Sequence, residues 1–246
     1  MNRVSVIIPT LNEAQTIGDL IRYLVNNSAL PEQLEIIVVD GGSTDNTIPI
    51  VNNVSSSIVE WSPKTINCAE LNITLLHSEK GRAKQMNLGA KNASGNILYF
   101  LHADSFPPQN FDGFIINEIE SGNQAGCFRM QFDSNHWWLR LASWLTQFSW
   151  RACRGGDQSQ FILRKLFDDI GGFDERYIIY EDNILINELF KRKQFVVINK
   201  KIQTSSRLYK KHGVWKLQYH FWTIYVKKWF GASADDLFTY YKKHLG

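Results

Sequence analysis

Two aspartates follow apolar runs at the points where buried strands would end. Asp40 comes directly after the run at residues 36–39, and Asp104 follows the run at 97–101 after two residues. A buried carboxylate is costly unless it is hydrogen-bonded, paired with a cation or bound to a metal. If the two strands are neighbours, both carboxylates line one crevice and indicate a ligand site, with a metal ion as one option. The alternative is that each carboxylate caps the next helix or turn.

The residues around these aspartates predict alternating strands and helices. β-branched apolar runs are typical of strands buried in a parallel sheet, and helical spacing of apolar residues follows them. The predicted strands lie at residues 4–8, 36–39, 73–76 and 97–101, and the predicted helices at 17–24, 43–51 and 81–92. Thr10 and Glu13 match a capping box for the first helix. This order predicts right-handed βαβ units, whose ligands bind at the carboxyl ends of the strands.

The second half of the chain shows a different order of predicted helices and strands. Helices are expected near residues 111–120 and 137–148 and from residue 180 onward, and strands near 126–132 and 160–163. Residues 55–72 are polar and irregular, with at most one short strand near 58–61.

Composition excludes several classes of protein. The three cysteines have no C-x-x-C spacing, so neither a disulfide framework nor a zinc site is expected, and a reducing compartment fits best. The sequence has no visible signal peptide and no run of about 18 apolar residues that could span a membrane. It also has no G-x-G-x-x-G turn and no Walker A loop. A nucleotide would therefore be held through a divalent metal and basic side chains.

The positive charge is concentrated near the C-terminus. Residues 199–246 contain ten Lys or Arg against two Asp, whereas residues 1–198 contain 17 basic and 22 acidic side chains. The lysines alternate with aromatic residues. The aromatic residues are Trp215, Tyr219, Phe221, Trp222, Tyr225, Trp229 and Phe230, and the lysines are Lys210, Lys211, Lys216, Lys227 and Lys228. This pattern suits peripheral contact with an anionic membrane. We nevertheless expect these residues to pack on the helix at 137–148, as a core or a homodimer surface, with membrane contact as the alternative; nucleic-acid binding is not expected.

Six stretches together resemble the family 2 glycosyltransferases, which have the GT-A fold. They are residues 4–13, 37–47, 81–90, 100–104, 171–175 and 180–182. The resemblance implies an α/β nucleotide-diphospho-sugar transferase fold, with a mostly parallel central sheet flanked by helices and a helical C-terminal tail. It implies one GT-A domain over residues 1–215. That domain has a nucleotide-sugar half (1–105) and an acceptor half (106–215), and residues 216–246 form the basic aromatic tail.

The resemblance also assigns roles to individual residues. Asp104 would bind Mg²⁺ or Mn²⁺, and His102 occupies the first position of the family's Asp-x-Asp motif. An imidazole prefers softer ions, so His102 is either a neutral hydrogen-bonding group or a metal ligand. The nucleotide-sugar site would comprise Pro9, Leu11, Asn12, Glu13, Asp40, Gly41, Gly81, Arg82, Lys84, His102, Ala103 and Arg207. The acceptor site would comprise Gly156, Asp157 and Gln158.

The activity implied is sugar transfer from a UDP- or GDP-sugar to the hydroxyl of a sugar or lipid-linked acceptor. An inverting reaction needs a carboxylate within reach of that hydroxyl. Glu181 and Asp182 begin an apparent helix, whose dipole keeps a carboxylate ionised. Asp182 is the expected base; the alternative is that this pair only caps the helix. A nucleotidyltransferase and a non-catalytic nucleotide-binding relic remain alternatives. The expected location is the cytoplasm, including the inner face of the membrane.

Overall fold

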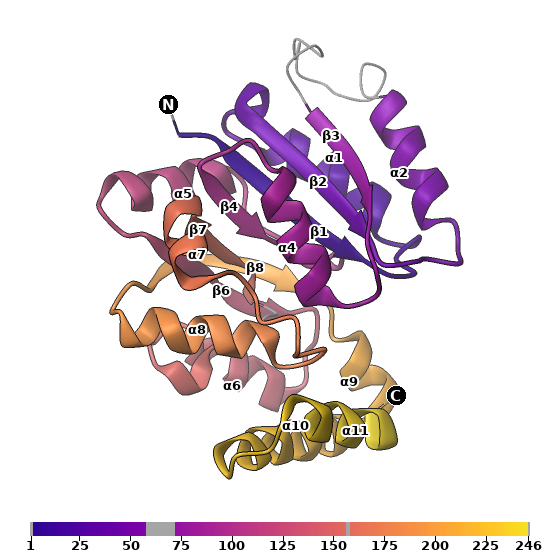
Figure 1. Ribbon diagram of the computed structural model, residues 1–246, viewed down its shortest axis with the longest axis vertical. Coiled ribbons are helices and arrows are strands. Elements are labelled where there is room, and N and C mark those ends of the chain that lie inside the picture. The colour runs from indigo at the N-terminus through magenta and orange to yellow at the C-terminus, as the bar shows by residue number, and fades with distance from the viewer. Residues whose placement is uncertain (1, 58–71, 156–157, 246) are drawn as a thin grey trace.

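The computed structural model describes residues 2–57, 72–155 and 158–245 (Figure 1). The strands of these residues form one eight-stranded sheet in the order β3-β2-β1-β4-β7-β6-β8-β5. Their bounds are β1 Val4–Thr10, β2 Leu34–Asp40, β3 Asn72–His77, β4 Ile97–Phe100, β5 Ser105–Phe106, β6 Ala125–Phe132, β7 Gln160–Leu163 and β8 Val196–Thr204. The strand expected at 58–61 lies outside the described residues.

The first four strands are parallel neighbours. β1 pairs with β2 on one side and with β4 on the other, and β3 pairs with β2. This confirms the predicted βαβ arrangement and places the carboxyl ends of β1, β2 and β4 at one edge. The second half is mixed, because β7 is antiparallel to β4 and β6, while β8 is parallel to β6 and antiparallel to β5. The sheet as a whole is mostly parallel, as predicted.

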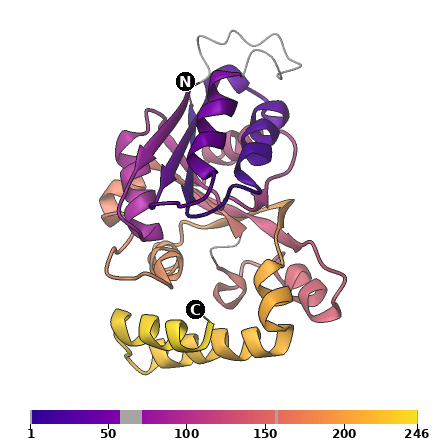
Figure 2. The ribbon, with the colours of Figure 1, turned by 90° about the vertical axis from the view of Figure 1, so that its right-hand side faces the viewer.

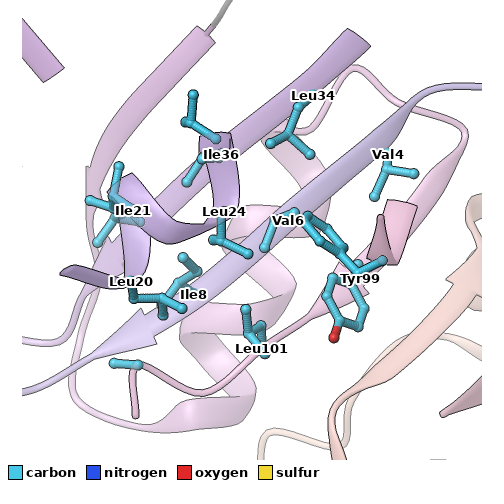
Figure 3. Packing of buried hydrophobic residues seen from close by; sticks show 14 of the residues in the cluster. Val4, Val6, Ile8, Leu20, Ile21, Leu24, Leu34, Ile36, Tyr99 and Leu101 are labelled. Atoms are coloured by element: carbon cyan, nitrogen blue, oxygen red, sulfur yellow. The ribbon is translucent and has the colours of Figure 1, made fainter. Parts of the chain in front are cut away.

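Helices cover both faces of the sheet (Figure 1). The helices of the described residues are α1 Ile17–Asn27, α2 Thr47–Ser56, α4 Arg82–Asn92, α5 Phe111–Glu120, α6 Trp137–Leu145, α7 Arg164–Ile170, α8 Glu181–Lys191, α9 Arg207–His212, α10 Val214–Trp229 and α11 Ala234–Leu245, with 3₁₀ turns η1 Pro31–Gln33 and η2 Arg151–Cys153. Val6 and Ile8 face a cluster with α1, α2 and α5, part of which Figure 3 shows. Ile7 faces the opposite cluster with α4, α7 and α8. The alternation follows from the two-residue period of a strand.

Two helix starts differ from the predictions. α1 begins at Ile17, and Thr10 is the last residue of β1, so the predicted capping box is wrong. The Thr10 hydroxyl instead lies 3.4 Å from Oδ1 of Asp40, in the pairing of β1 with β2. α2 begins at Thr47 and not near Ser43, because the Ser43 side chain is bonded to Asp40 in the loop that precedes the helix.

The C-terminal helices lie at one end of the molecule. β8, which the sequence did not predict, leads into α9, and α10 and α11 then run beside each other away from the sheet (Figure 2). Over the described part of the chain, no helix is both long and apolar enough to cross a bilayer.

Candidate active site

Asp40 organises the turn after β2. Its carboxylate is buried, and Oδ2 accepts hydrogen bonds from the backbone N–H groups of Gly42 and Ser43, both at 2.9 Å. Oδ1 accepts a third from Ser43 Oγ at 2.5 Å. Three donors therefore satisfy the carboxylate without a cation. These contacts are those of a residue that caps a turn, which was the alternative prediction for Asp40. Gly42 has φ of 93°, a left-handed conformation that favours glycine.

The loops after β1 and β2 are joined to each other. Asn12, at φ of 58°, accepts a hydrogen bond on Oδ1 from the Thr44 N–H at 2.8 Å, and its own N–H donates to Ser43 Oγ at 2.8 Å. The Glu13 N–H donates to Thr47 Oγ1 at 2.9 Å. These contacts make the two loops one rigid rim at the end of the parallel strands. Beside them, Pro9 is buried in β1 and Leu11 is partly exposed.

Gln85 of α4 holds the ends of β1 and β2 together. Its buried Nε2 donates to the carbonyls of Thr10, at 2.8 Å, and Val39, at 2.7 Å. Gly41 packs directly against this amide. A side chain at position 41 would place its Cβ about 3.0 Å from Gln85, so the close contact favours glycine. Gln85 was not among the predicted site residues. The sequence feature that could have indicated its role is the position of an amide side chain among the small and apolar residues of α4 that face the core.

Arg207 joins two carboxylates that are far apart in sequence. Its guanidinium pairs with both carboxylate oxygens of Glu13, at 2.9 and 3.2 Å, and lies 3.7 Å from Oδ2 of Asp104. The pairing of Ser105 with Thr204 brings the start of α9 to the end of β4. The hydrogen bonds to Glu13 raise the pKa of Arg207 above its usual, already high value, so the guanidinium stays protonated. Glu13, Asp104 and Arg207 therefore form one charged cluster at the sheet edge.

His102 lies two residues before Asp104 and is neutral. Dehydration of the ring by surrounding atoms, together with the positive charge of Arg82, lowers its pKa to about 3. A neutral imidazole can donate or accept one hydrogen bond. Ala103, between the two, is buried in the main core.

The start of α4 contacts the start of α8. Nε of Arg82 lies 2.7 Å from Oε1 of Glu181, whose side chain is fully buried. Asp182, the next residue, is 8% exposed. Gly81, at φ of 143°, precedes α4 in a conformation that favours glycine. Lys84 instead pairs with the exposed Glu79. The ion pair of Arg82 links the predicted donor half to the helix that carries the predicted base.

A second arginine holds α8 from the opposite side. Arg151 of η2 donates from NH2 to Oδ1 of Asn183 at 2.9 Å, and its Nε donates to Oδ1 of Asn187. Tyr225 of α10 also donates to Oδ1 of Asn183, at 3.3 Å. The sequence reasoning missed Arg151. These contacts fix the first turns of α8 and hence the position of Asp182.

The predicted acceptor residues are only partly described. Gly156 and Asp157 lie outside the described residues. Gln158 is buried, accepts a hydrogen bond from Arg154 NH1 at 2.6 Å and donates to the Cys153 carbonyl at 2.5 Å. Its amide is therefore hydrogen-bonded to the protein on both the oxygen and the nitrogen, and its role toward an acceptor stays a prediction.

The described residues do not by themselves complete a metal site, since no group of three His, Cys, Asp or Glu side chains is arranged to hold an ion among them. Magnesium, however, is usually bound by one or two carboxylates together with substrate phosphates. The partly exposed Asp104 carboxylate fits that kind of site, with the remaining ligands supplied by a diphosphate.

Comparison with known sequences identifies relatives of one kind. The profile described as "Glycosyl transferase family 2" matches residues 5–174, more than half of the chain. A "Probable glycosyltransferase YdaM" of Bacillus subtilis is 26% identical over 200 residues, which cover 75% of this chain and 46% of that protein. The "Dolichyl N-acetyl-alpha-D-glucosaminyl phosphate 3-beta-D-2,3-diacetamido-2,3-dideoxy-beta-D-glucuronosyltransferase" of Methanococcus voltae is 30% identical over 121 residues, 49% of this chain and 34% of that protein. The chain thus spans less than half the length of these two relatives.

Solved structures show the same fold. S. aureus TarS 1–349 in complex with UDP superposes with a TM-score of 0.63 at 19% identity, covering 82% of this chain and 60% of that one. The mannosyltransferase PcManGT from Pyrobaculum calidifontis, in complex with GDP-Man and Mn²⁺, superposes with a TM-score of 0.64 at 21% identity. It covers 91% of this chain and 60% of that one. Both have the GT-A fold, which confirms the expected architecture.

Proposed function

Because the chain belongs to glycosyl transferase family 2, we propose that it transfers a sugar from a UDP- or GDP-linked donor to an acceptor hydroxyl. The observation that carries this proposal is the cluster of Glu13, Asp104 and Arg207 at the carboxyl ends of β1 and β4. In an open α/β sheet this edge is where ligands bind. The cluster provides a partly exposed carboxylate next to a permanent cation, which suits a diphosphate and its metal. Residues 1–105 would bind the donor and 106–215 the acceptor.

The donor would bind on the rim formed by the loops after β1 and β2. Pro9, Leu11 and Asn12 would line the nucleotide pocket, and Asp40 and Gly41 shape its floor through the turn they form. Asp104 would hold Mg²⁺ or Mn²⁺, which when bound would offset the charge of the leaving diphosphate. Arg207 would exchange part of its contact with Glu13 for a phosphate oxygen, and Arg82 lies near enough to His102 to influence the same region.

Asp182 is the proposed general base of an inverting transfer. It lies in the first turn of α8, where the helix dipole stabilises the ionised carboxylate. The buried Glu181 fixes that turn by its ion pair with Arg82. In-line attack requires the acceptor hydroxyl to lie between Asp182 and the donor sugar, with its proton passing to the carboxylate. The acceptor is proposed to be a sugar or a lipid-linked group, in line with the name of the Methanococcus relative.

Ligand-induced thermal stabilisation tests the donor site directly. We expect UDP or GDP, or a sugar conjugate of one of them, to raise the melting temperature in the presence of Mn²⁺. A ligand at about one hundred times its dissociation constant adds about 2.7 kcal/mol to the stability of the folded state. Asp104→Asn should abolish the metal-dependent part of the shift. Asp169→Asn, an exposed aspartate on α7, is the matched control and should keep it.

A shift with nucleoside triphosphates alone would contradict the donor assignment and indicate a nucleotidyltransferase. No shift with any nucleotide would leave the chain a non-catalytic member of the family.

A further inference from the structure

α10 carries apolar side chains on two opposite sides. Leu217, His220 and Ile224 are buried, and Ile224 packs with Tyr177 and Leu237. Residues at steps of four, three, four and three from Trp215 share the other side, because an α-helix turns about 100° per residue. This second set, which we call the aromatic face, consists of Trp215, Tyr219, Trp222, Val226, Trp229 and the following Phe230. Its members are 49% to 87% exposed.

α6 extends the aromatic face. Trp137, 61% exposed, lies 5.7 Å from Trp215 between ring centroids, and Trp138 lies 5.4 Å from Trp215 and 5.9 Å from Trp222. Trp144 is also exposed. The predicted packing of the tail on this helix thus occurs at one end of α10, yet most of the aromatic surface stays open to solvent. A contiguous apolar surface of this kind marks an interaction site.

The charges on α9, α10 and α6 are of one sign, and Asp235 and Asp236 follow in the first turn of α11, where Asp236 lies close enough to Lys227 for their charges to interact. The segment 207–234 contains one arginine and five lysines and no acidic residue, and α6 contains none either. Lys216 and Lys227 are exposed on α10 itself. A second copy of the chain on this face would bring like charges together, which disfavours a homodimer there. An anionic surface would instead be complementary to the face and its lysines.

We propose that the aromatic face and its lysines bind the protein flat on an anionic lipid bilayer. Indole and phenol rings place an apolar body and a polar group at the interface between lipid and water, and neighbouring lysines attract anionic headgroups. The position of the helices allows this, because α10 and α11 lie at one end of the molecule, away from the sheet, in both views (Figures 1 and 2).

Binding in this orientation would place α10 between the lipid and the start of α8, because Tyr180 and Ile184 pack in the cluster of Ile224, on the side of α10 opposite the aromatic face. The ring of Tyr225 lies 5.3 Å from that of Tyr180, directly before α8, and its hydroxyl contacts Asn183. If the proposed function is correct, an acceptor anchored in the bilayer would reach Asp182 past α10. The lipid binding itself requires no turnover.

Co-sedimentation with vesicles tests the proposal. We expect the full chain to bind vesicles of equimolar phosphatidylcholine and phosphatidylglycerol at low salt, and not vesicles of phosphatidylcholine alone. Added salt should weaken binding, because it screens the lysines. Tryptophan fluorescence should shift to shorter wavelength on binding. Lys216→Glu with Lys227→Glu should weaken binding by at least about fivefold for each lysine.

Two further variants separate apolar from charge effects. Trp229→Ser with Phe230→Ser should reduce binding without changing the melting temperature, since these side chains are 87% and 85% exposed. Lys91→Glu with Lys165→Glu makes the same charge change on α4 and α7 and should bind as the wild type does. Equal binding of all variants, or no binding to anionic vesicles, would overturn the proposal. So would a dimer in sedimentation velocity that the Trp229 and Phe230 changes abolish while vesicle binding is absent.

Discussion

The charged side chains at the sheet edge and at the start of α8 divide the proposed chemistry between them. Arg207 neutralises Glu13 and lies beside Asp104, where a leaving diphosphate would carry its charge. The buried carboxylate of Glu181 is neutralised by the partly exposed Arg82. Asp182 is the carboxylate of that turn proposed to take a proton. Arg207 is therefore proposed to stabilise charge and Asp182 to accept a proton, so substitutions of the two residues should have different effects.

Asp182→Asn should abolish transfer and leave donor binding intact. An amide of nearly the same shape cannot accept the proton, and general-base catalysis contributes about 10²- to 10⁴-fold to the rate. The measurement is release of nucleoside diphosphate, with donor affinity taken from thermal shift. Asp235→Asn, also in the first turn of a helix, controls for loss of a helix-start charge. Transfer by Asp182→Asn at the wild-type rate would rule out this base.

Arg207→Gln should lower kcat/KM for the donor by about 10- to 100-fold, because hydrogen bonds to charged groups contribute about 1.5–3 kcal/mol. The free energy of unfolding should change by no more than about 1 kcal/mol, since the ion pair with Glu13 is partly exposed. Urea unfolding and steady-state kinetics measure the two effects. Arg176→Gln, which removes an exposed pair with Asp174, is the control. A fall in stability with unchanged kcat/KM would mean that Arg207 is only structural.

The elements show why some features could be predicted and others not. The runs at 4–8, 36–39 and 97–101 are almost entirely apolar, with Ser5 as an exception, because β1, β2 and β4 are buried on both faces. Such runs are visible in the sequence. β8 was missed because its pairing with β6 shifts register between Phe128 and Arg129. The shift interrupts the alternation that would have revealed the strand.

The candidate site could likewise be predicted only in part from the sequence. Asp40 and Asp104 could be placed at one edge, because each follows an apolar run and parallel neighbours end together. The contact of Arg207 with Glu13 could not be derived from spacing, since it depends on the pairing of β5 with β8. The role of Gln85 depends on two backbone carbonyls, which leave no trace in sequence.

Glu35 of β2 ties the opposite end of the sheet together. Its buried carboxylate accepts hydrogen bonds from Ser5 Oγ at 2.5 Å and from the Ser94 N–H at 2.8 Å. Burial alone would raise the pKa of Glu35, but these hydrogen bonds outweigh it and hold the pKa below its usual value of 4.5. The folded state thus favours the ionised form. Its stabilising effect is present above pH 4.5 and is lost as the pH falls below that value.

Glu35→Gln should lower the free energy of unfolding at pH 7 by about 1–3 kcal/mol, because its amide cannot accept all of these hydrogen bonds. Urea unfolding at pH 7 and at pH 4 is the measurement. We expect the loss of stability between the two pH values to be smaller in the variant than in the wild type. Glu32→Gln, in the turn before β2, should retain the wild-type difference. An unchanged pH dependence in Glu35→Gln would contradict the assignment.

At the scale of the whole molecule, the C-terminal helices pack in a cluster of their own with residues before and at the start of α8. Leu237 of α11 is fully buried with Ile224 and Tyr177, in a cluster separate from those that line the sheet. A small separate cluster can open without the rest of the fold. We therefore expect α10 and α11 to open more readily than β1, β2 and β4.

Leu237→Ala tests whether α10 and α11 open more readily than the strands of the sheet. The cavity should cost about 2–5 kcal/mol, as for other buried leucines. The loss should fall on α10 and α11, whose amides should exchange faster with deuterium, while amides of β1 and β4 keep their protection. Leu24→Ala in α1 is the matched change in the main cluster and should accelerate exchange in the sheet instead. Faster exchange everywhere in Leu237→Ala would mean that the C-terminal helices unfold only with the whole molecule.

The contact of Arg207 with Glu13 also bears on biosynthesis. The two residues are separated by 194 positions, and Asp104 lies roughly midway between them. Translation proceeds at about 5–20 residues per second and N-terminal segments fold first. Asp104 is therefore synthesised roughly 5 to 20 seconds before Arg207 is added, and Glu13 roughly 10 to 40 seconds before it. On the ribosome, the two carboxylates of this edge are therefore present for seconds before the arginine that pairs with them has been added.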